Sequence, residues 1–166
     1  MEDEEDQILK TQIKANEEAM PEFTTKNKPY SPYVSLVLRG EELDPQMITE
    51  MLGITPRRSF KRGDQRGRDN KDKKWSYGFW MFESAGQIES LNLKMHIIWL
   101  LEQLEPAKPN LLEISRNDAF DAKISCFWIM PSTNEVLTID PELLSRIAAL
   151  NIRIELDIYS PRLRRE

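Results

Sequence analysis

Apolar and polar residues alternate with period two in four stretches of the chain, which predicts strands with one buried face. The four stretches are residues 33–40, 74–84, 122–130 and 152–159. The second is the richest in aromatic residues: Trp75, Tyr77 and Phe79 fall on one face, and Trp80 and Phe82 fall on the other. Aromatic residues on both faces are typical of a central strand, or of a strand whose outer face is covered.

Between these strands, apolar residues recur at helical spacing. Residues 44–53 and 140–151 both begin with Asp-Pro, in which the aspartate caps free amides and the proline fits the first helical turn. Residues 90–105 carry the widest apolar arc, which predicts a helix that packs on two sides, against the sheet and against another helix or a second subunit. Residues 110–120 are ambiguous, and we expect a short helix capped by Asn110.

The order of these elements predicts the fold class. A strand followed by an Asp-Pro helix occurs twice, so we expect two strand–helix–strand units joined by the helix at 90–105. We predict a single α+β domain over residues 29–166, with a four-stranded, mostly antiparallel sheet and helices mainly on one face, in a ferredoxin-like plan. An α/β arrangement with helices on both faces is the alternative, and the polar outer faces of the first and last strands favour one open face. Residues 1–28 are polar and acidic, and they predict a mobile N-terminal arm.

Several pieces of sequence together resemble a known family. In chain order over residues 33–159 they are VSLVLRGEELDPQMITEMLGITPRRSFKRGD, a strand led by Trp75, WLLEQLEP, ISCFWI and DPELLSRIAALNIRIELDIY. The combination resembles the uncharacterised bacterial family catalogued as domain of unknown function 4279. The resemblance implies a small cytosolic bacterial domain, and it brings no established activity, cofactor or catalytic residue. The acidic arm and the charged insert at 65–74 are additions of this chain to that pattern.

Composition indicates an ordinary globular protein. The chain has 166 residues, of which 40% are hydrophobic, and a formal net charge of −5. Its N-terminus is acidic where a secretory signal would be basic, and the longest apolar run, residues 97–101, is far too short to span a bilayer. We therefore expect a cytoplasmic protein with no membrane partner.

Candidate catalytic residues are few. The single cysteine, Cys126, and the single histidine, His96, form neither a disulfide nor a metal-binding pair by spacing. Cys126 lies in the middle of a predicted strand, where we expect a buried small hydrophobe, and we expect His96 at an exposed or rim position of the long helix. We accordingly predict no catalytic residue, no metal and no cofactor, and a protein that is not an enzyme. A poorly recognised hydrolase is the third-ranked hypothesis.

The strongest electrostatic feature is the stretch at residues 55–75. It contains nine basic and three acidic residues, a charge of 9 − 3 = +6, so the rest of the chain carries −5 − 6 = −11. Three interpretations stay open: a charged loop at about 61–74 that is solvated or neutralises itself, a site for an acidic protein partner, and a nucleic-acid or phosphorylated-ligand site through the basic segment 57–68.

We place the binding residues on the first part of this stretch and on the strand that follows. In this part we expect Phe60 to pack in the core and a turn at Gly63. The predicted binding residues are Arg57, Arg58, Lys61, Arg62, Trp75 and Tyr77. The leading functional hypothesis is a non-enzymatic interaction protein of the immunity or accessory type, which binds a protein partner that is acidic where it faces the basic loop. Self-association through the helix at 90–105 is also expected, and nucleic-acid or phosphorylated-ligand binding is the alternative function.

Overall fold

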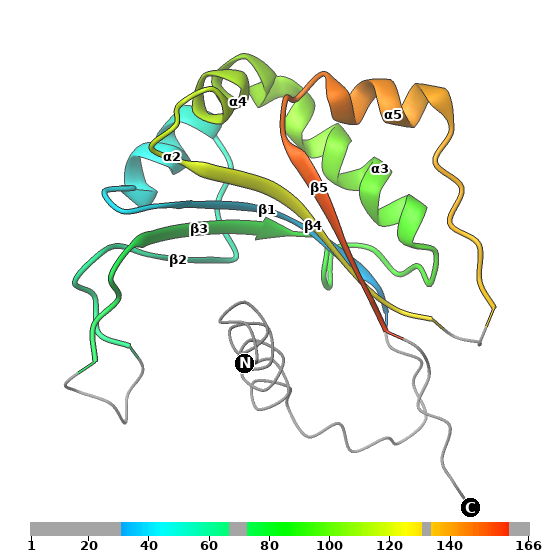
Figure 1. Ribbon diagram of the computed structural model, residues 1–166, viewed down its shortest axis with the longest axis horizontal. Helices are drawn as coiled ribbons and strands as arrows, with labels where there is room; N and C mark the ends of the chain where they lie inside the picture. Colours follow the sequence, from blue (N-terminus) through cyan, green and yellow to red (C-terminus); the bar gives the residue numbers. More distant parts are fainter. Residues whose placement is uncertain (1–30, 67–72, 131–133, 160–166) are drawn as a thin grey trace, which may run out of the picture.

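The computed structural model describes residues 31–66, 73–130 and 134–159 (Figure 1). Its elements are β1 (Tyr33–Gly40), α2 (Pro45–Leu52), β2 (Arg58–Phe60), β3 (Gly78–Glu83), α3 (Leu93–Leu104), a 3₁₀ turn (Glu105–Ala107), α4 (Lys108–Ser115), β4 (Asp121–Ile129), α5 (Pro141–Ala148) and β5 (Arg153–Tyr159). The predicted arm at 1–28 lies outside the described residues, as does the middle of the charged loop.

The strands form one mixed sheet in the order β2-β3-β1-β4-β5. β1 is antiparallel to both β3 and β4, β2 is antiparallel to β3, and β5 is parallel to β4. The connection from β1 to β2 therefore skips β3, and the connection from β3 to β4 skips β1. This is the split βαβ arrangement, to which α5 and β5 add a further unit beside β4.

The predicted α+β class is confirmed, and the predicted four-stranded, mostly antiparallel sheet agrees only roughly, because the sheet is mixed and has five strands. The additional strand, β2, has only three residues, too few for a period-two pattern to be recognised. β2 also changes the pairing, because the chain passes through it after α2 and returns as β3, antiparallel to β1. The last strand is a parallel edge strand outside the split βαβ arrangement.

Figure 1 shows the helices on one face of the sheet, with no described helix on the other. The core lies between these two layers. Its largest fully buried side chains include Leu36 and Leu38 of β1, Trp80 of β3, Ile97 of α3 and Ile124 of β4. Since alternate strand residues point to opposite faces, the intervening residues of the same strands form an open face.

Local signals set the helix boundaries. Asp44 accepts a hydrogen bond from the Gln46 amide, and Gly53 ends α2 with a φ of 65°. Asp140 accepts from the Leu143 amide at the start of α5. The expected cap at Asn110 is wrong, because α4 begins earlier and the Asn110 side-chain amide, Nδ2, donates to the Met51 carbonyl instead.

The expectation for His96 is wrong as well. Its side chain is fully buried in α3, with Nδ1 2.8 Å from Ser84 Oγ and Nε2 2.9 Å from the Ser90 carbonyl oxygen. The apolar arc of α3 is wide enough that position 96 faces the sheet, and these two bonds satisfy the imidazole there. Cys126 is buried as predicted, and burial raises the pKa of its thiol to about 12.

Most of the wide apolar arc of α3 is buried against the rest of the domain. Trp99 stacks on Phe82 with ring centroids 5.5 Å apart, whereas Leu91 and Met95 are about half exposed, at 51% and 48%. Self-association through this helix stays a prediction. No helix among the described residues combines the length and apolar character that crossing a bilayer needs.

Candidate binding surface on the open sheet face

The register of the sheet brings aromatic and arginine side chains together on the open face. Phe60 of β2 lies opposite Phe79 of β3, and Phe79 lies opposite Arg39 of β1. Tyr77 and Trp75 precede β3 at period two from Phe79. The face away from the helices therefore carries aromatic side chains along the β2 edge.

The four aromatic rings contact one another directly. Phe60 stacks on Trp75 with centroids 3.9 Å apart and planes 15° apart, and on Phe79 at 5.0 Å and 11°. Tyr77 packs against both Phe60 and Trp75 at 5.7 and 5.8 Å. All four side chains are partly exposed. They form a preassembled apolar surface at the edge of the sheet.

Three guanidinium groups lie over these rings. Arg39 is 3.9 Å from the Tyr77 ring centroid, and Arg66 is 4.5 Å from that of Trp75. Arg58 is 5.7 Å from the Phe60 centroid and 5.8 Å from the Trp75 centroid. Cation–π contacts of this length hold an arginine in place while its N–H groups stay available. We refer to these seven residues as the aromatic–arginine cluster: Arg39, Arg58, Phe60, Arg66, Trp75, Tyr77 and Phe79.

A hairpin after β2 positions Trp75 in this cluster. The Gly63 amide donates to the Trp75 carbonyl at 2.8 Å, and the Trp75 amide donates to the Asp64 carbonyl at 2.9 Å. Gly63 has a φ of 90°, which a residue with a side chain rarely adopts. Gln65 and Lys74 extend the pairing. The described ends of the loop predicted at 61–74 are thus paired backbone.

Two of the predicted basic residues are neutralised by carboxylates instead of joining the cluster. Arg62 pairs with Glu41 at 2.7 Å and also with Glu42. Arg57 lies 3.5 Å from Glu83, whose side chain is only 13% exposed. Burial raises the pKa of Glu83, and Arg57 opposes that effect. All three carboxylates lie outside the basic stretch, so these pairs join it to the turn before α2 and to β3.

The predicted site is therefore divided by the structure. Arg58, Trp75 and Tyr77 come together, whereas Arg57 and Arg62 are ion-paired. Lys61 is exposed beside them and does not contact the rings, and its amide donates to the Asp64 carboxylate at 2.8 Å.

Four members of the cluster are not among the residues predicted from the sequence: Arg39, Phe60, Arg66 and Phe79. The expectation that Phe60 packs in the core is wrong, since its ring lies on the open face. Phe79 shares a face with Trp75 and Tyr77 at period two, which was a usable signal. Arg39 and Arg66 gave none, because only the strand register and the hairpin place them over aromatic rings.

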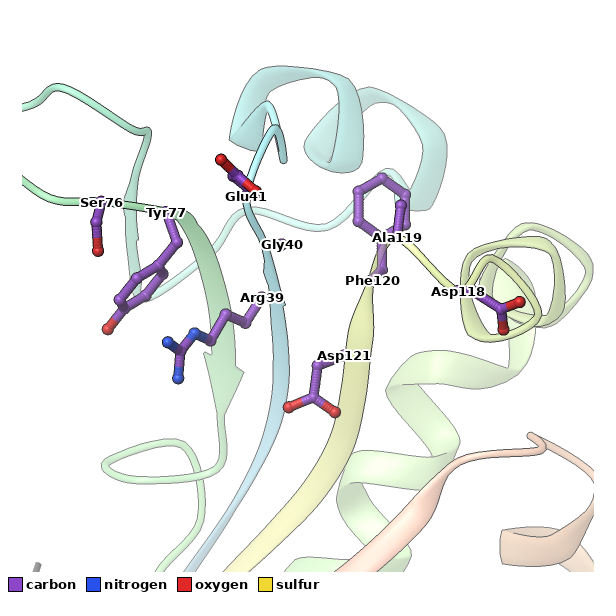
Figure 2. Close-up of a pocket in the computed structure, with 9 residues that line it drawn as sticks. All are labelled: Arg39, Gly40, Glu41, Ser76, Tyr77, Asp118, Ala119, Phe120 and Asp121. Atoms are coloured by element: carbon purple, nitrogen blue, oxygen red, sulfur yellow. The ribbon is translucent and has the colours of Figure 1, made fainter.

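A shallow pocket of about 560 Å³ adjoins the cluster (Figure 2). Arg39 and Tyr77 form one side of it, and Asp118, Phe120 and Asp121 form the other. The Arg39 guanidinium extends toward the Tyr77 ring in this view, so the pocket and the cluster share these two side chains. Within the described part of the chain, no group of three or more His, Cys, Asp or Glu residues is arranged to hold a metal ion.

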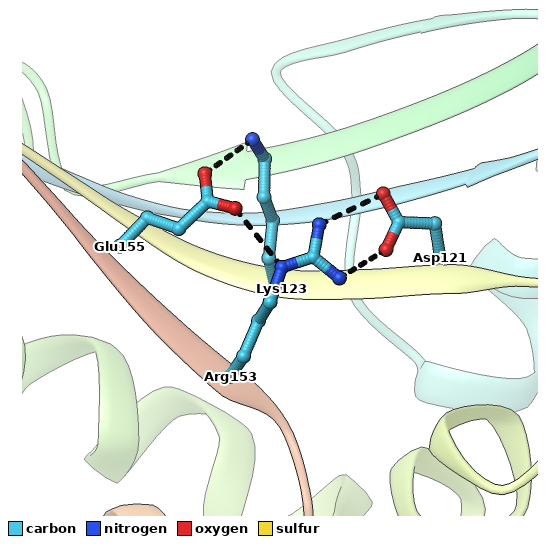
Figure 3. A network of polar contacts seen from close by, with 4 residues as sticks. All are labelled: Asp121, Lys123, Arg153 and Glu155. Atoms are coloured by element: carbon cyan, nitrogen blue, oxygen red, sulfur yellow. Dashed lines mark hydrogen bonds and ion pairs between the residues drawn. The ribbon is translucent and has the colours of Figure 1, made fainter.

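Beyond the pocket, the charges of the open face compensate one another (Figure 3). Arg153 of β5 binds both carboxylate oxygens of Asp121, one of them at 3.0 Å, and it also donates to Glu155 at 2.9 Å. Lys123 donates to the same Glu155 at 2.6 Å. The bond from Arg153 lowers the pKa of Asp121, and the bond from Lys123 is the largest cause of the lowered pKa of Glu155. The side chains of Lys123 and Arg153 are thus both paired with carboxylates.

Comparison with known proteins adds a family and no activity. A family model described as "Domain of unknown function (DUF4279)" matches residues 28–161, which is most of the chain and includes every residue of the cluster. Neither the curated proteins nor the solved structures compared with the chain give a significant match.

Proposed function

Because this chain belongs to the family described as a domain of unknown function (DUF4279), a description that names no activity, we propose its function from the site itself. The protein is a non-enzymatic binding protein of the immunity or accessory type. It binds an acidic segment of a protein partner on the aromatic–arginine cluster.

The observation that carries this proposal is the composition of the cluster. Protein interfaces are enriched in Trp, Tyr, Phe and Arg, and the residues that dominate binding energy are most often Trp, Tyr and Arg. Here all four types are concentrated on one partly exposed patch. Arg39, Arg58 and Arg66 each contact a ring and have no carboxylate within ion-pair distance among the described residues. Such groups favour a partner that supplies carboxylates.

The rings are held in place before a partner arrives. Phe60 and Phe79 are fixed by paired strands, and Trp75 is fixed by the hairpin. Ordering an interface side chain on binding costs roughly 0.5–1.5 kcal/mol. A preassembled stack avoids part of this cost, which favours a binding role for these side chains over a purely structural one.

Nucleic acid is the second candidate, and a specific observation favours it. Aromatic and arginine side chains on the open face of a split βαβ sheet are the means by which several single-strand binders hold bases. The ring contacts count against this candidate. Trp75 already stacks on Phe60 and carries Arg66 over its ring, so a base would have to displace one of these groups. Two nearby arginines are also ion-paired.

Site-specific photo-crosslinking tests the proposal. The photoreactive amino acid benzoylphenylalanine replaces Tyr77 in the cluster or, as a matched control, Leu144, which is 53% exposed on α5. After irradiation in native cells, we expect a discrete crosslinked protein at position 77 and none at 144. Crosslinks of equal yield at both positions, or none at 77, would overturn the proposal.

Binding to oligonucleotides separates the two candidates. Fluorescence anisotropy with labelled single-stranded DNA and RNA at low salt should show no binding. If binding occurs, weakens steeply as salt rises and is lost in Arg58→Gln but retained in Arg57→Gln, the nucleic-acid candidate replaces the first. Arg57 is the matched control because its charge is already compensated by Glu83.

A further inference from the structure

We propose that the acidic run at residues 2–6 docks on the aromatic–arginine cluster of its own chain and covers the partner site. The run is Glu-Asp-Glu-Glu-Asp, five consecutive carboxylates. It lies outside the described residues. The contacts of the cluster, the distribution of charge and the length of chain between the two all favour this docking.

Among the described residues, the arginines of the cluster have no carboxylate partner of the kind that neighbouring arginines have. Arg57, Arg62 and Arg153 each bind carboxylates of the domain. The three cluster arginines instead rest on rings, with no carboxylate within ion-pair distance in the described part of the chain. A guanidinium stacked on a ring still presents N–H donors in its plane, in the geometry that a carboxylate fits. Within the described residues, Asp121 influences Arg39 only from beyond ion-pair distance, so the three guanidinium groups have N–H donors that no carboxylate contacts directly.

The sequence contains one run of carboxylates long enough to meet three arginines at once, residues 2–6. Residues 55–75 carry +6, and residues 2–6 supply −5 of the −11 carried elsewhere. No other stretch of the sequence has more than two consecutive acidic residues. Because charged segments attract over about 10 Å at ordinary ionic strength, the run and the cluster are drawn together once the chain brings them near.

The point of attachment makes the contact possible without any change in the domain. β1 is a central strand that begins at Tyr33, whose ring lies on the open face against Phe127 at 4.9 Å. Arg39 is six residues further along β1, about 20 Å away at the rise of a strand. The 27 residues from position 6 to position 33 can span up to about 90 Å, so the run easily reaches the cluster.

Tethering also compensates for a weak contact. Two groups joined by a short chain meet at an effective concentration of about 1 mM. An interaction that is negligible between separate molecules at micromolar concentration is then substantially populated within one molecule. A regulatory role for this contact rests on the proposed function, because the run would compete with an acidic partner for the same arginines. The contact itself needs no partner.

Paramagnetic relaxation in the full-length protein tests the contact. Gln7→Cys adds a labelling site beside the run and removes none of its carboxylates. Cys126 is buried, so a nitroxide reagent should label position 7 selectively, and unsubstituted protein should take no label. We expect the Trp75 indole and Gly63 amide signals to lose more than half of their intensity at low salt and to recover at 0.5 M salt, where electrostatic contacts are screened on the order of 4 Å.

Two charge variants identify the contact. Converting the run to Gln-Asn-Gln-Gln-Asn, or replacing Arg58 and Arg66 together by Gln, should restore the Trp75 signal. The matched double variant of Arg57 and Arg62 to Gln should leave the broadening in place, because those side chains are already ion-paired. No broadening at Trp75, or broadening that the run variant leaves unchanged, would overturn the proposal.

A mixed sample identifies which chain supplies the run. Nitroxide-labelled protein at natural isotope abundance is mixed with unlabelled ¹⁵N protein. Broadening at Trp75 in this sample would assign the occupant to a second copy and overturn docking within one chain. The measurement contains no partner, so its failure leaves the photo-crosslinking result untouched. Crosslinking can equally fail while the internal contact is found.

Discussion

Replacing Ser84 by Ala should destabilise the domain strongly, because this hydroxyl completes two buried hydrogen bonds. Ser84 Oγ accepts from the Val34 amide at 2.9 Å and lies 2.8 Å from His96 Nδ1. His96 Nε2 lies 2.9 Å from the Ser90 carbonyl oxygen, which can only accept, so Nε2 carries the proton and Nδ1 accepts from the Ser84 hydroxyl. Ser84 and His96 have no exposed surface.

The magnitude follows from the groups that lose their partners. Ser84→Ala leaves the Val34 amide and His96 Nδ1 buried without a hydrogen bond, and each such group costs about 1–3 kcal/mol. We expect the free energy of unfolding to fall by about 2–6 kcal/mol, a large fraction of the 5–15 kcal/mol typical of a domain. When Ser84 and His96 are both replaced, the loss of unfolding free energy should be smaller than the sum of the two single losses, because neither residue is left as an unpaired partner of the other.

Urea unfolding followed by tryptophan fluorescence measures this effect, with midpoints compared at equal slope. Ser59→Ala, on the exposed strand β2, is the matched control and should leave the midpoint unchanged. The double variant Ser84→Ala, His96→Leu should cost less than the sum of its single variants. A loss of less than about 0.5 kcal/mol for Ser84→Ala, the range of ordinary surface substitutions, or strict additivity, would refute the reasoning.

Three further predictions follow from single sites. Iodoacetamide should modify Cys126 only when the domain opens, because the thiol is buried and burial raises its pKa to about 12; rapid modification of native protein would contradict this. Arg153 lowers the pKa of Asp121, so the contribution of this pair is complete above the unfolded pKa near 4 and is lost as the pH falls through the lower folded pKa. Arg153→Gln should therefore reduce the difference in unfolding free energy between pH 7 and pH 3. The reduction should be at most about 1 kcal/mol, because both side chains are about half exposed. Urea midpoints at the two pH values that match those of the unsubstituted protein would contradict this prediction. Gly78→Ala would place a methyl group 2.0 Å from the Leu43 carbonyl oxygen and should cost about 1–3 kcal/mol in the same unfolding assay, whereas an unchanged midpoint would show that the backbone yields.

The boundaries of α2, the start of α5 and the long strands could be predicted because their signals are local. Asp44, Gly53 and Asp140 act within one turn of the helices that they delimit. The alternation in β1 and β4 reports one buried face whichever strands lie beside them. The buried position of Cys126 followed from the same alternation.

The parts that could not be predicted depend on contacts between distant segments. β2 is a strand only because β3 pairs with it, and its position in the sheet decides that the ring of Phe60 lies on the open face. His96 is polar yet buried, because Ser84 and Ser90 happen to satisfy its two nitrogens. The predicted site residues divide for the same reason. Trp75 and Tyr77 share a strand-like period and come together, whereas the carboxylates that pair with Arg57 and Arg62 lie about 20 or more residues away in the chain.

Because β2 is short, the aromatic–arginine cluster can come apart while the rest of the domain stays folded. β2 is a three-residue edge strand held to β3 alone, and such elements open locally at a small fraction of the free energy of global unfolding. When β2 detaches, the Phe60 ring leaves the stack and Trp75 loses its closest neighbour, while the helices and the other four strands stay folded. The amides of residues 58–60 should therefore exchange with deuterium much faster than those of β1. The protein can thus lose the aromatic–arginine cluster and still be counted as native by circular dichroism.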